Sequence, residues 1–234
     1  MSRTPTLALG LAALLATASA AAAEAYRVYA SNEYDASISV IDPETGMVTG
    51  TIPISGRPGD VRPRGLAVSP DGGTIYVAVS DFLPRKESPE DAIVAIDVAT
   101  DKVKRSYRAG GNPERVAISP DGKQIWAALE ATAQAVGIDA ETGAELGRFP
   151  TGVESEGVAV SPDGRFVYVT AETSHTVTVI DTQAMKVVKH LLVGNRPRDV
   201  TFSQDGSRAY VSAEIGGTVT VIDAKAHKVI GAIN

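Results

Sequence analysis

Charged side chains recur at matched positions along this chain of 234 residues. One set consists of glutamates that each follow a short apolar segment: Glu33, Glu130, Glu172 and Glu214. A second set lies just before another apolar segment and mixes both signs: Arg64, Glu114, Arg115, Glu156, Arg198 and Asp199. Arginine and carboxylate side chains gathered in one place can bind a polar small molecule or dock an electron-transfer partner. These ten are our candidate ligand- or partner-binding residues; the alternative is that they pair between neighbouring units and hold them in register.

The elements that must position these residues belong to a tandem repeat. The sequence Ser-Pro-Asp-Gly occurs three times, with a fourth, degenerate copy: Ser69–Gly72, Ser119–Gly122, Ser161–Gly164 and Ser203–Gly206. An Ile-Asp pair recurs with it and ends at Asp42, Asp97, Asp139, Asp181 and Asp223. From the second copy onward both motifs recur every 42 residues. A repeat of about this length, built of short strands, is typical of the blades of a β-propeller.

One repeat unit predicts four antiparallel strands. In the third copy the predicted strands are the apolar or alternating segments 157–161, 166–170, 176–180 and 186–193. Pro162, Asp163 and Gly164 predict a tight turn between the first two strands, because proline presets φ, aspartate bonds the turn backbone and glycine accepts a positive φ. The predicted fold class is therefore an all-β propeller of four-stranded antiparallel blades.

The same pattern covers the rest of the chain. It places blades roughly at 26–55, 65–109, 115–151, 157–193 and 199–233, the first with only three strands. One aromatic residue holds the same place in each blade, and we expect these residues to pack between blades: Tyr29, Tyr76, Trp126, Tyr168 and Tyr210. The Ile-Asp aspartates recur too regularly to be catalytic, and we expect them to cap turns by accepting backbone N–H groups.

The number of blades leaves two possibilities open. The first blade lacks its innermost strand and the chain stops in the outer strand of the last blade. Because natural sheets avoid unpaired edges, we expect these residues to be the front part of a ring of about seven blades, incomplete at the C-terminus. The alternative is a five-bladed ring with one strand fewer. The second blade is also longer than the others between Ser80 and Asp97, which indicates either a functional loop or a harmless insertion.

The N-terminus and the composition narrow the function classes. Residues 1–23 are typical of a secretory signal, with Arg3, an apolar run at 7–15 and small residues after it. We therefore expect an exported, periplasmic protein. The formal net charge of −6 and the lack of basic clusters argue against binding to nucleic acid or to anionic membranes. The absence of cysteine excludes disulfides, thiolate metal sites and c-type haem attachment.

Two segments resemble a known repeat family. Tyr168–Asp181 (YVTAETSHTVTVID) and Tyr210–Asp223 (YVSAEIGGTVTVID) resemble the YVTN-type β-propeller repeat. Val193–Ile230 is similar to the β-propeller proteins associated with PQQ-dependent catabolism, which are encoded beside periplasmic alcohol oxidation systems. The resemblance covers Tyr26 to Asn234 and implies relatives that are complete propellers of about seven blades. The resemblance implies a cellular setting for the protein and no particular reaction, because the biochemical role of that group is itself poorly defined.

The resemblance, together with the lack of a catalytic motif, favours a non-catalytic binding or scaffold protein that is accessory to periplasmic PQQ-dependent alcohol oxidation. Its expected partner is a periplasmic dehydrogenase, an electron-transfer protein or a polar small molecule. No cofactor is predicted for the chain itself, because quinoprotein dehydrogenases resemble one another through tryptophan-bearing blades and Trp126 is the single tryptophan here.

Two further interpretations of the side chains concern metal binding and catalysis. His175, His190 and His227 fall at unrelated repeat positions, so no metal site is predicted. The alternative function is a lactonase-type hydrolase. In that case Glu156 would act as acid or base while Arg115 or Arg198 polarises the carbonyl.

Overall fold

A computed structural model describes residues 26–54, 61–81 and 91–234. The predicted leader at residues 1–23 and most of the longer segment between Ser80 and Asp97 lie outside the described residues. None of the three described ranges contains a helix that is long and apolar enough to cross a membrane.

The described chain forms five antiparallel sheets that follow one another along the sequence. The first sheet has three strands: β1 (Val28–Asn32), β2 (Ser37–Ile41) and β3 (Val48–Pro53). The other four sheets each have four strands in consecutive order. Their strands are β4 (Val61–Val68), β5 (Thr74–Asp81), β6 (Ala92–Asp97) and β7 (Lys102–Arg108); β8 (Pro113–Ile118), β9 (Gln124–Leu129), β10 (Gln134–Asp139) and β11 (Glu145–Pro150); β12 (Ser155–Val160), β13 (Phe166–Ala171), β14 (Thr176–Asp181) and β15 (Lys186–Leu192); β16 (Pro197–Phe202), β17 (Arg208–Ala213), β18 (Thr218–Asp223) and β19 (Lys228–Ile233). The predicted all-β fold of four-stranded blades is confirmed.

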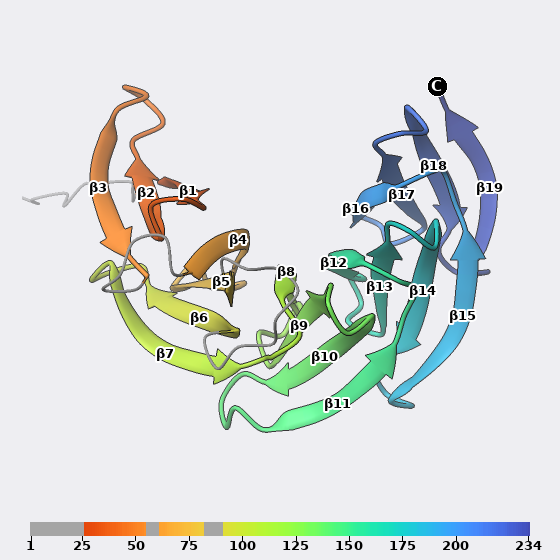
Figure 1. The fold of residues 1–234 in the computed structure, drawn as a ribbon, viewed down its shortest axis with the longest axis horizontal. Coiled ribbons are helices and arrows are strands. Elements are labelled where there is room, and N and C mark those ends of the chain that lie inside the picture. Colours follow the sequence, from red (N-terminus) through yellow and green to blue (C-terminus); the bar gives the residue numbers. More distant parts are fainter. Residues whose placement is uncertain (1–25, 55–60, 82–90) are drawn as a thin grey trace, which may run out of the picture.

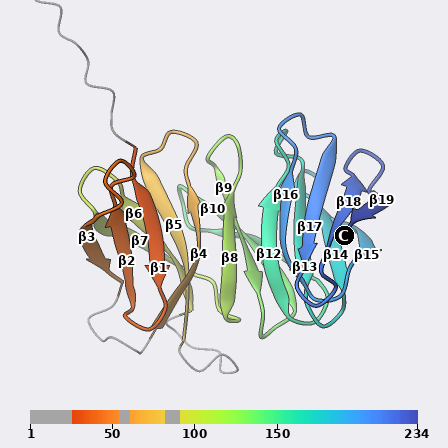
Figure 2. The ribbon, with the colours of Figure 1, turned by 90° about the horizontal axis from the view of Figure 1, so that it is seen from above.

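The sheets stand around a common centre as the blades of a propeller do (Figure 1). In each four-stranded sheet the first strand lies nearest the centre of the arc and the fourth lies outermost. Seen from above, the sheets stand side by side and their inner strands run along the common axis (Figure 2). Residues at the start of the inner strands β4, β8, β12 and β16 are therefore placed at one end of that axis.

Hydrogen bonds to and from the serine hydroxyl stabilise each Ser-Pro-Asp-Gly turn. In the third copy the Ser161 hydroxyl donates to Asp163 Oδ1 at 2.5 Å and accepts the N–H of Phe166 at 2.9 Å. Asp163 Oδ1 also accepts the N–H of Arg165 at 3.0 Å, and Gly164 takes a left-handed φ of 74°. These hydrogen bonds, the one from Ser161 first, lower the pKa of Asp163. The other three copies repeat the arrangement.

The Ile-Asp aspartates cap the turn that follows the third strand of each blade. Asp181 Oδ1 accepts the backbone N–H groups of Gln183 and Ala184, both at 2.9 Å. These bonds lower the pKa of Asp181. The matching aspartates in the other blades accept one or two turn N–H groups in the same way. The predicted capping role is confirmed.

Consecutive Ser-Pro-Asp-Gly turns also pack on one another. A Cβ placed on Gly164 would lie 3.6 Å from Cδ of Pro120 in the preceding turn, and one on Gly206 would lie 3.5 Å from Cδ of Pro162. Both distances are ordinary van der Waals contact. The proline and the glycine of the motif therefore contribute to contact between neighbouring blades as well as to the turn itself.

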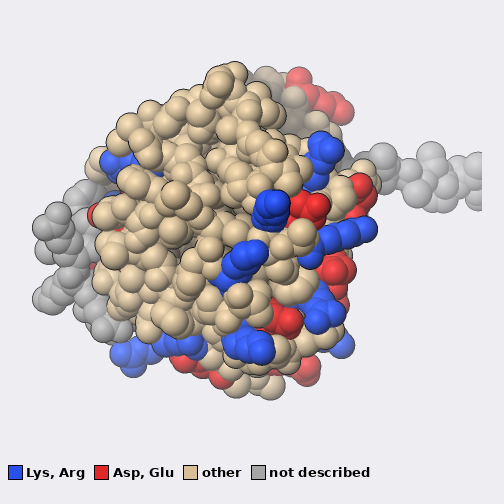
Figure 3. All heavy atoms as spheres, turned by 90° about the vertical axis from the view of Figure 1, so that its right-hand side faces the viewer, with Lys and Arg blue, Asp and Glu red and all other residues tan. Residues whose placement is uncertain are grey.

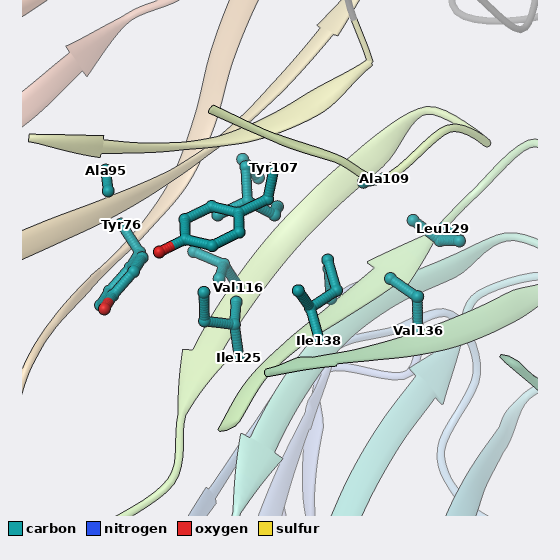
Figure 4. Packing of buried hydrophobic residues seen from close by; sticks show 12 residues of the cluster. Tyr76, Ala95, Tyr107, Ala109, Val116, Ile125, Leu129, Val136 and Ile138 are labelled. Atoms are coloured by element: carbon teal, nitrogen blue, oxygen red, sulfur yellow. The ribbon is translucent and has the colours of Figure 1, made fainter. Parts of the chain in front are cut away.

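The recurring aromatic residues pack between blades. Tyr76 contributes to the buried cluster between the second and third sheets, with Val116 and Ile125 from the third sheet (Figure 4). Trp126 and Tyr168 belong to the clusters at the next two interfaces. The corresponding residues at the two ends are less enclosed: Tyr29 packs against the first interface, and Tyr210 in the last described sheet is half-buried. The predicted packing is confirmed at the interfaces that the structure describes.

Candidate functional site

The inner strands carry charged residues in β-bulges. The pairing registers of β8 with β9 and of β16 with β17 shift at Glu114 and Arg198, each the extra residue of its bulge. The registers of β4 and β12 shift across Arg64–Gly65 and Glu156–Gly157. A bulge bends its strand and re-aims side chains. The inner strands begin two to four residues earlier than the predicted blade boundaries. The reason is that backbone pairing with the second strand of the blade continues on the N-terminal side of each bulge.

Glycine in two of these bulges lets neighbouring inner strands approach closely. A Cβ on Gly157 would lie 2.7 Å from the carbonyl oxygen of Arg198 and 2.8 Å from Cα of Asp199. A Cβ on Gly65 would lie 2.9 Å from Cα of Arg115. These atoms belong to the backbone, so the strands would have to move apart to admit a methyl group. The spacing of the inner strands at this end of the axis therefore depends on glycine.

Replacing Gly157 by alanine is expected to lower the free energy of unfolding by about 1–3 kcal/mol, because overpacking forces the backbones of β12 and β16 apart. Urea denaturation followed by circular dichroism measures the change. Gly231→Ala is the matched control, since no atom lies within 4 Å of a Cβ at that strand position. Equal stability of the two variants would contradict the close approach.

Two arginines connect carboxylates from several blades. Arg64 pairs with three of them: Glu33 at 3.4 Å, Glu114 at close contact and Glu156 at 3.9 Å. Arg198 likewise pairs with three: Glu156 at 2.9 Å, Glu172 at close contact and Glu214 at 3.8 Å. Glu156 thus lies between the two guanidinium groups. The resulting chain of ion pairs draws on residues of all five described blades.

Burial raises the pKa of two glutamates in this chain of ion pairs. Glu114 is 2% exposed, and burial, reinforced by the negative charge of Glu156, raises its pKa to about 8 in spite of Arg64. The negative charge of Glu130 adds to this rise in the pKa of Glu114. Burial raises the pKa of Glu156 as well, against the opposing effect of Arg198 and Arg64. Glu114 therefore holds a proton to a higher pH than an exposed glutamate does.

The structure brings all ten predicted residues together. We call the group the Arg/Glu cluster: Glu33, Arg64, Glu114, Arg115, Glu130, Glu156, Glu172, Arg198, Asp199 and Glu214. Arg115 pairs with Asp199 at 3.5 Å, and their side chains are 43% and 47% exposed. Of the two arginines predicted to act with Glu156, Arg198 is the one that forms the close ion pair. Many of the residues thus pair between blades, as the register-holding alternative expects.

Three further members of the cluster were not predicted. Arg196 pairs with Glu172 at 2.9 Å and with Glu214 at 3.1 Å. Asn112 donates to Glu130 and, at 3.3 Å, to Glu114. Arg62 lies 3.9 Å from Glu33. These three residues share one repeat position, two residues before Arg64, Glu114 and Arg198, and that shared spacing is the signal that could have identified them.

A small cavity opens at the Arg/Glu cluster. Its volume is about 230 Å³, and its lining is almost entirely polar: Ser31, Glu33, Arg64, Gly65, Glu114, Arg115, Glu156 and Arg198. Pockets that take drug-sized ligands have volumes of roughly 300–1,000 Å³, so this cavity suits a small, polar molecule. On the face beside the last sheets, basic and acidic side chains are intermingled, without a broad area of one sign (Figure 3).

The histidines make separate structural contacts. His175 Nδ1 accepts the N–H of Arg196 at 3.1 Å, His190 Nδ1 bonds the Thr178 hydroxyl at 3.0 Å, and His227 Nδ1 bonds the Tyr168 hydroxyl at 2.7 Å. Among residues 26–54, 61–81 and 91–234, no group of three or more His, Cys, Asp or Glu side chains has an arrangement that could hold a metal ion.

Comparison with known proteins gives a fold and a partial family match. Residues 129–234, less than half of the chain, match the family of the Cytochrome D1 heme domain, an eight-bladed β-propeller. No curated protein matches the sequence. Hydrazine synthase from Kuenenia stuttgartiensis is similar in structure, with a TM-score of 0.65 and 25% identity over 80% of this chain and 52% of that one. A functionally unknown protein from Desulfotomaculum acetoxidans aligns with a TM-score of 0.71 and 17% identity over 88% of this chain and 66% of that one.

These likenesses show the β-propeller fold, and the chain spans between half and two thirds of the length of the two solved structures. The partial family match raises the question of a haem. Haem iron takes an axial His, Met, Cys or Tyr, whereas the charged lining of the central cavity consists of arginine and glutamate. The described residues at this position do not fit a haem.

Proposed function

We propose that this protein is an exported, non-catalytic β-propeller of the YVTN type that binds a small polar ligand or a protein partner at the Arg/Glu cluster. Its expected setting is the periplasm, as an accessory to PQQ-dependent alcohol oxidation. The observation that carries the binding role is the cavity of about 230 Å³ at the meeting point of the inner strands. The resemblance of Val193–Ile230 to propellers associated with PQQ-dependent catabolism supports the setting.

The exposed part of the cluster is the part suited to binding. The ion pair of the buried Glu156 with the partly exposed Arg198 serves mainly to join blades, because removal of Arg198 would leave a buried charge without compensation. Arg115 and Asp199 form an exposed pair, which contributes little to stability. They can therefore change partners at little cost, which is what a binding site at the end of a propeller axis requires.

A complementation experiment tests this function. Deleting the gene in the organism that encodes it is expected to slow PQQ-dependent oxidation of alcohols by intact cells, and the wild-type gene is expected to restore the rate. The double variant Arg115→Ala, Asp199→Ala should be exported in normal amounts and fail to restore it, whereas Arg165→Ala, which lies outside the Arg/Glu cluster, should restore it. An unchanged rate after deletion would contradict the accessory role.

A lactonase-type hydrolase is the second candidate. One observation favours it: Glu114 lines the cavity with a pKa of about 8, close to the value that a general acid or base needs at neutral pH. Glu156 and Arg198 lie beside it at 2.9 Å from each other. Turnover of lactones by the purified chain that is lost in both Glu114→Gln and Glu156→Gln would establish this reaction. A folded, exported protein that is inactive on a lactone panel would exclude it.

A further inference from the structure

A second cavity lies at the opposite end of the propeller axis from the Arg/Glu cluster. The inner strands run from that cluster towards the Ser-Pro-Asp-Gly turns, and the cavity opens between the turns of the fourth and fifth blades. Its volume is about 340 Å³, against about 230 Å³ at the Arg/Glu cluster. Its lining includes two phenylalanines, two aspartates and a lysine: Phe166, Phe202, Asp163, Asp205 and Lys225.

The repeat provides a direct comparison for this cavity. The turns of the third and fourth blades form an equivalent cavity of about 290 Å³, lined by the matching serine, proline and aspartate residues. Three side chains distinguish the later cavity at shared repeat positions: Phe166 in place of Gln124, Phe202 in place of Val160 and Lys225 in place of Gln183. The turns form without these three side chains, so the two rings and the ammonium group are not requirements of the turn itself.

The two phenylalanine rings are fixed by neighbouring aromatic side chains. Phe202 makes an edge contact with the buried Tyr168 at a centroid distance of 4.8 Å. Phe166 makes an edge contact with His227 at 4.4 Å, and His227 in turn bonds the Tyr168 hydroxyl at 2.7 Å. Rings held in this way offer an apolar wall without further ordering, which lowers the cost of binding an apolar group.

The charged groups of the lining have bonding capacity left for a ligand. Asp163 and Asp205 hold their turns through Oδ1, and no hydrogen bond among the described residues goes to Oδ2 of either one. The turn bonds, that from the serine hydroxyl first, lower the pKa of both carboxyls, which are therefore charged at neutral pH. Lys225 is exposed, and none of the ion pairs formed by the described residues includes it.

Further charges surround this lining. Arg165 lies over the Phe166 ring at 5.4 Å and pairs with Asp181 at 3.5 Å. Asp223 accepts the backbone N–H of Lys225 at 3.0 Å, and the charge of Lys225 helps to lower the pKa of Asp223. Because carboxylates outnumber cations around the cavity, a ligand with only a negative charge is disfavoured. A ligand carboxylate can pair with Lys225 when the same ligand brings an ammonium group for the aspartates.

We propose that this second cavity binds a free α-amino acid with an apolar or aromatic side chain. Its ammonium group pairs with Asp163 or Asp205, its carboxylate pairs with Lys225, and its side chain packs against Phe166 and Phe202. The volume of about 340 Å³ lies at the small end of the range for ligand pockets, which suits a molecule of this size. The site is separate from the Arg/Glu cluster, so the inference goes beyond the proposed function and does not depend on it.

A titration of the full chain with L-phenylalanine, followed by proton–nitrogen correlation NMR at pH 7, tests the proposal. We expect the amide signals of the two turns, such as that of Gly206, to shift with a Kd below about 10 mM, a weak-binding limit. Signals of the inner strands at the Arg/Glu cluster should stay in place. The proposal is overturned if neither phenylalanine nor leucine binds below this limit, or if the shifts are confined to the Arg/Glu cluster.

Three analogues test the individual contacts. Phenethylamine lacks the carboxylate, phenylpropionate lacks the ammonium group, and alanine lacks the large apolar side chain. Each should bind at least about fivefold more weakly than phenylalanine, because each loses one of the three contacts. Phenethylamine or phenylpropionate that binds as tightly as phenylalanine would contradict the pairing of both ligand charges.

Variants taken from the preceding blade test the residues. Lys225→Gln and Phe202→Val each introduce the side chain that the fourth blade carries at the same repeat position, so both are compatible with the turn. Each should raise the Kd of phenylalanine at least about fivefold. Gln183→Lys, at the equivalent cavity, is the matched control and should leave the Kd unchanged. Binding to Lys225→Gln that equals binding to the wild type would overturn the proposal, and this exposed position makes loss of folding an unsuitable explanation for weaker binding.

Discussion

Replacing Arg198 by alanine is expected to lower the free energy of unfolding by about 3 kcal/mol. Glu156 and Glu172 are both about 5% exposed and both pair with Arg198, so the substitution leaves two buried carboxylates with less compensation. Breaking a buried ion pair from one side costs about 3–5 kcal/mol. The low end of that range applies because the Arg198 side chain is itself 35% exposed, and water can enter in its place. Urea denaturation at pH 7 measures the loss.

Arg165→Ala is the matched control for this change. Arg165 also pairs with a carboxylate, that of Asp181 at 3.5 Å, but the Arg165 side chain is 52% exposed. We therefore expect its removal to cost less than about 1 kcal/mol. Similar losses in the two variants would show that Arg198 is only a solvated surface charge, and the Arg/Glu cluster would then not join the blades.

Replacing Trp126 by alanine is expected to cost about 3–5 kcal/mol, which is the range for removing a large buried aromatic side chain. Trp126 is fully buried between the third and fourth blades. Its ring packs on Phe149 at a centroid distance of 5.5 Å, and a Cβ on Gly137 would lie 3.0 Å from it. Its Nε1 donates to Gln124 at 3.1 Å. Circular dichroism during urea denaturation measures the change without relying on tryptophan fluorescence.

Tyr210→Ala provides the comparison within the same repeat position. Tyr210 is half-buried, so its truncation removes fewer contacts and should cost clearly less than the change at Trp126. Trp126→Phe should recover much of the loss, because a ring still fills the interface. A loss in Trp126→Ala no greater than that in Tyr210→Ala would contradict the role of this position as a blade-to-blade contact.

The blade architecture could be predicted because its determinants are local. The Pro162-Asp163-Gly164 turn and the alternation of Val177 and Val179 with threonines each specify a hairpin or a strand within a few residues. The capping role of Asp181 is local in the same sense, since it accepts N–H groups two and three residues ahead. Because the sequence motifs repeat, the same local interactions form in successive blades.

The inner surface of the propeller was predictable only in part. Shared repeat positions identified the ten charged residues, but the bulges that hold Glu114 and Arg198 depend on pairing with the next strand. The contact of Arg64 with Glu156 joins blades that are not neighbours, which a period of 42 residues does not encode. The protonation of Glu114 arises from burial and from the surrounding carboxylates, and both exist only after the blades assemble.

The raised pKa of Glu114 links the stability of the fold to pH. The ordinary pKa of this carboxyl is 4.5, and in the folded chain it is about 8. Since the folded value lies above the unfolded one, the contribution of this proton to stability is fully present below about pH 4.5 and is lost as the pH rises through about 8. The slope of unfolding free energy against pH should therefore be negative between these values in the wild type and smaller in Glu114→Gln.

The most direct measurement is the titration of Glu114 itself. Carbon-13 NMR of protein labelled at the glutamate carboxyl groups follows each resonance with pH, and the signal that disappears in Glu114→Gln identifies the residue. An apparent pKa near 8 is the predicted result, and it would show that the bulged inner strands assemble a buried, proton-holding cluster. A Glu114 carboxyl that titrates near 4.5 would contradict the buried Arg/Glu cluster as described.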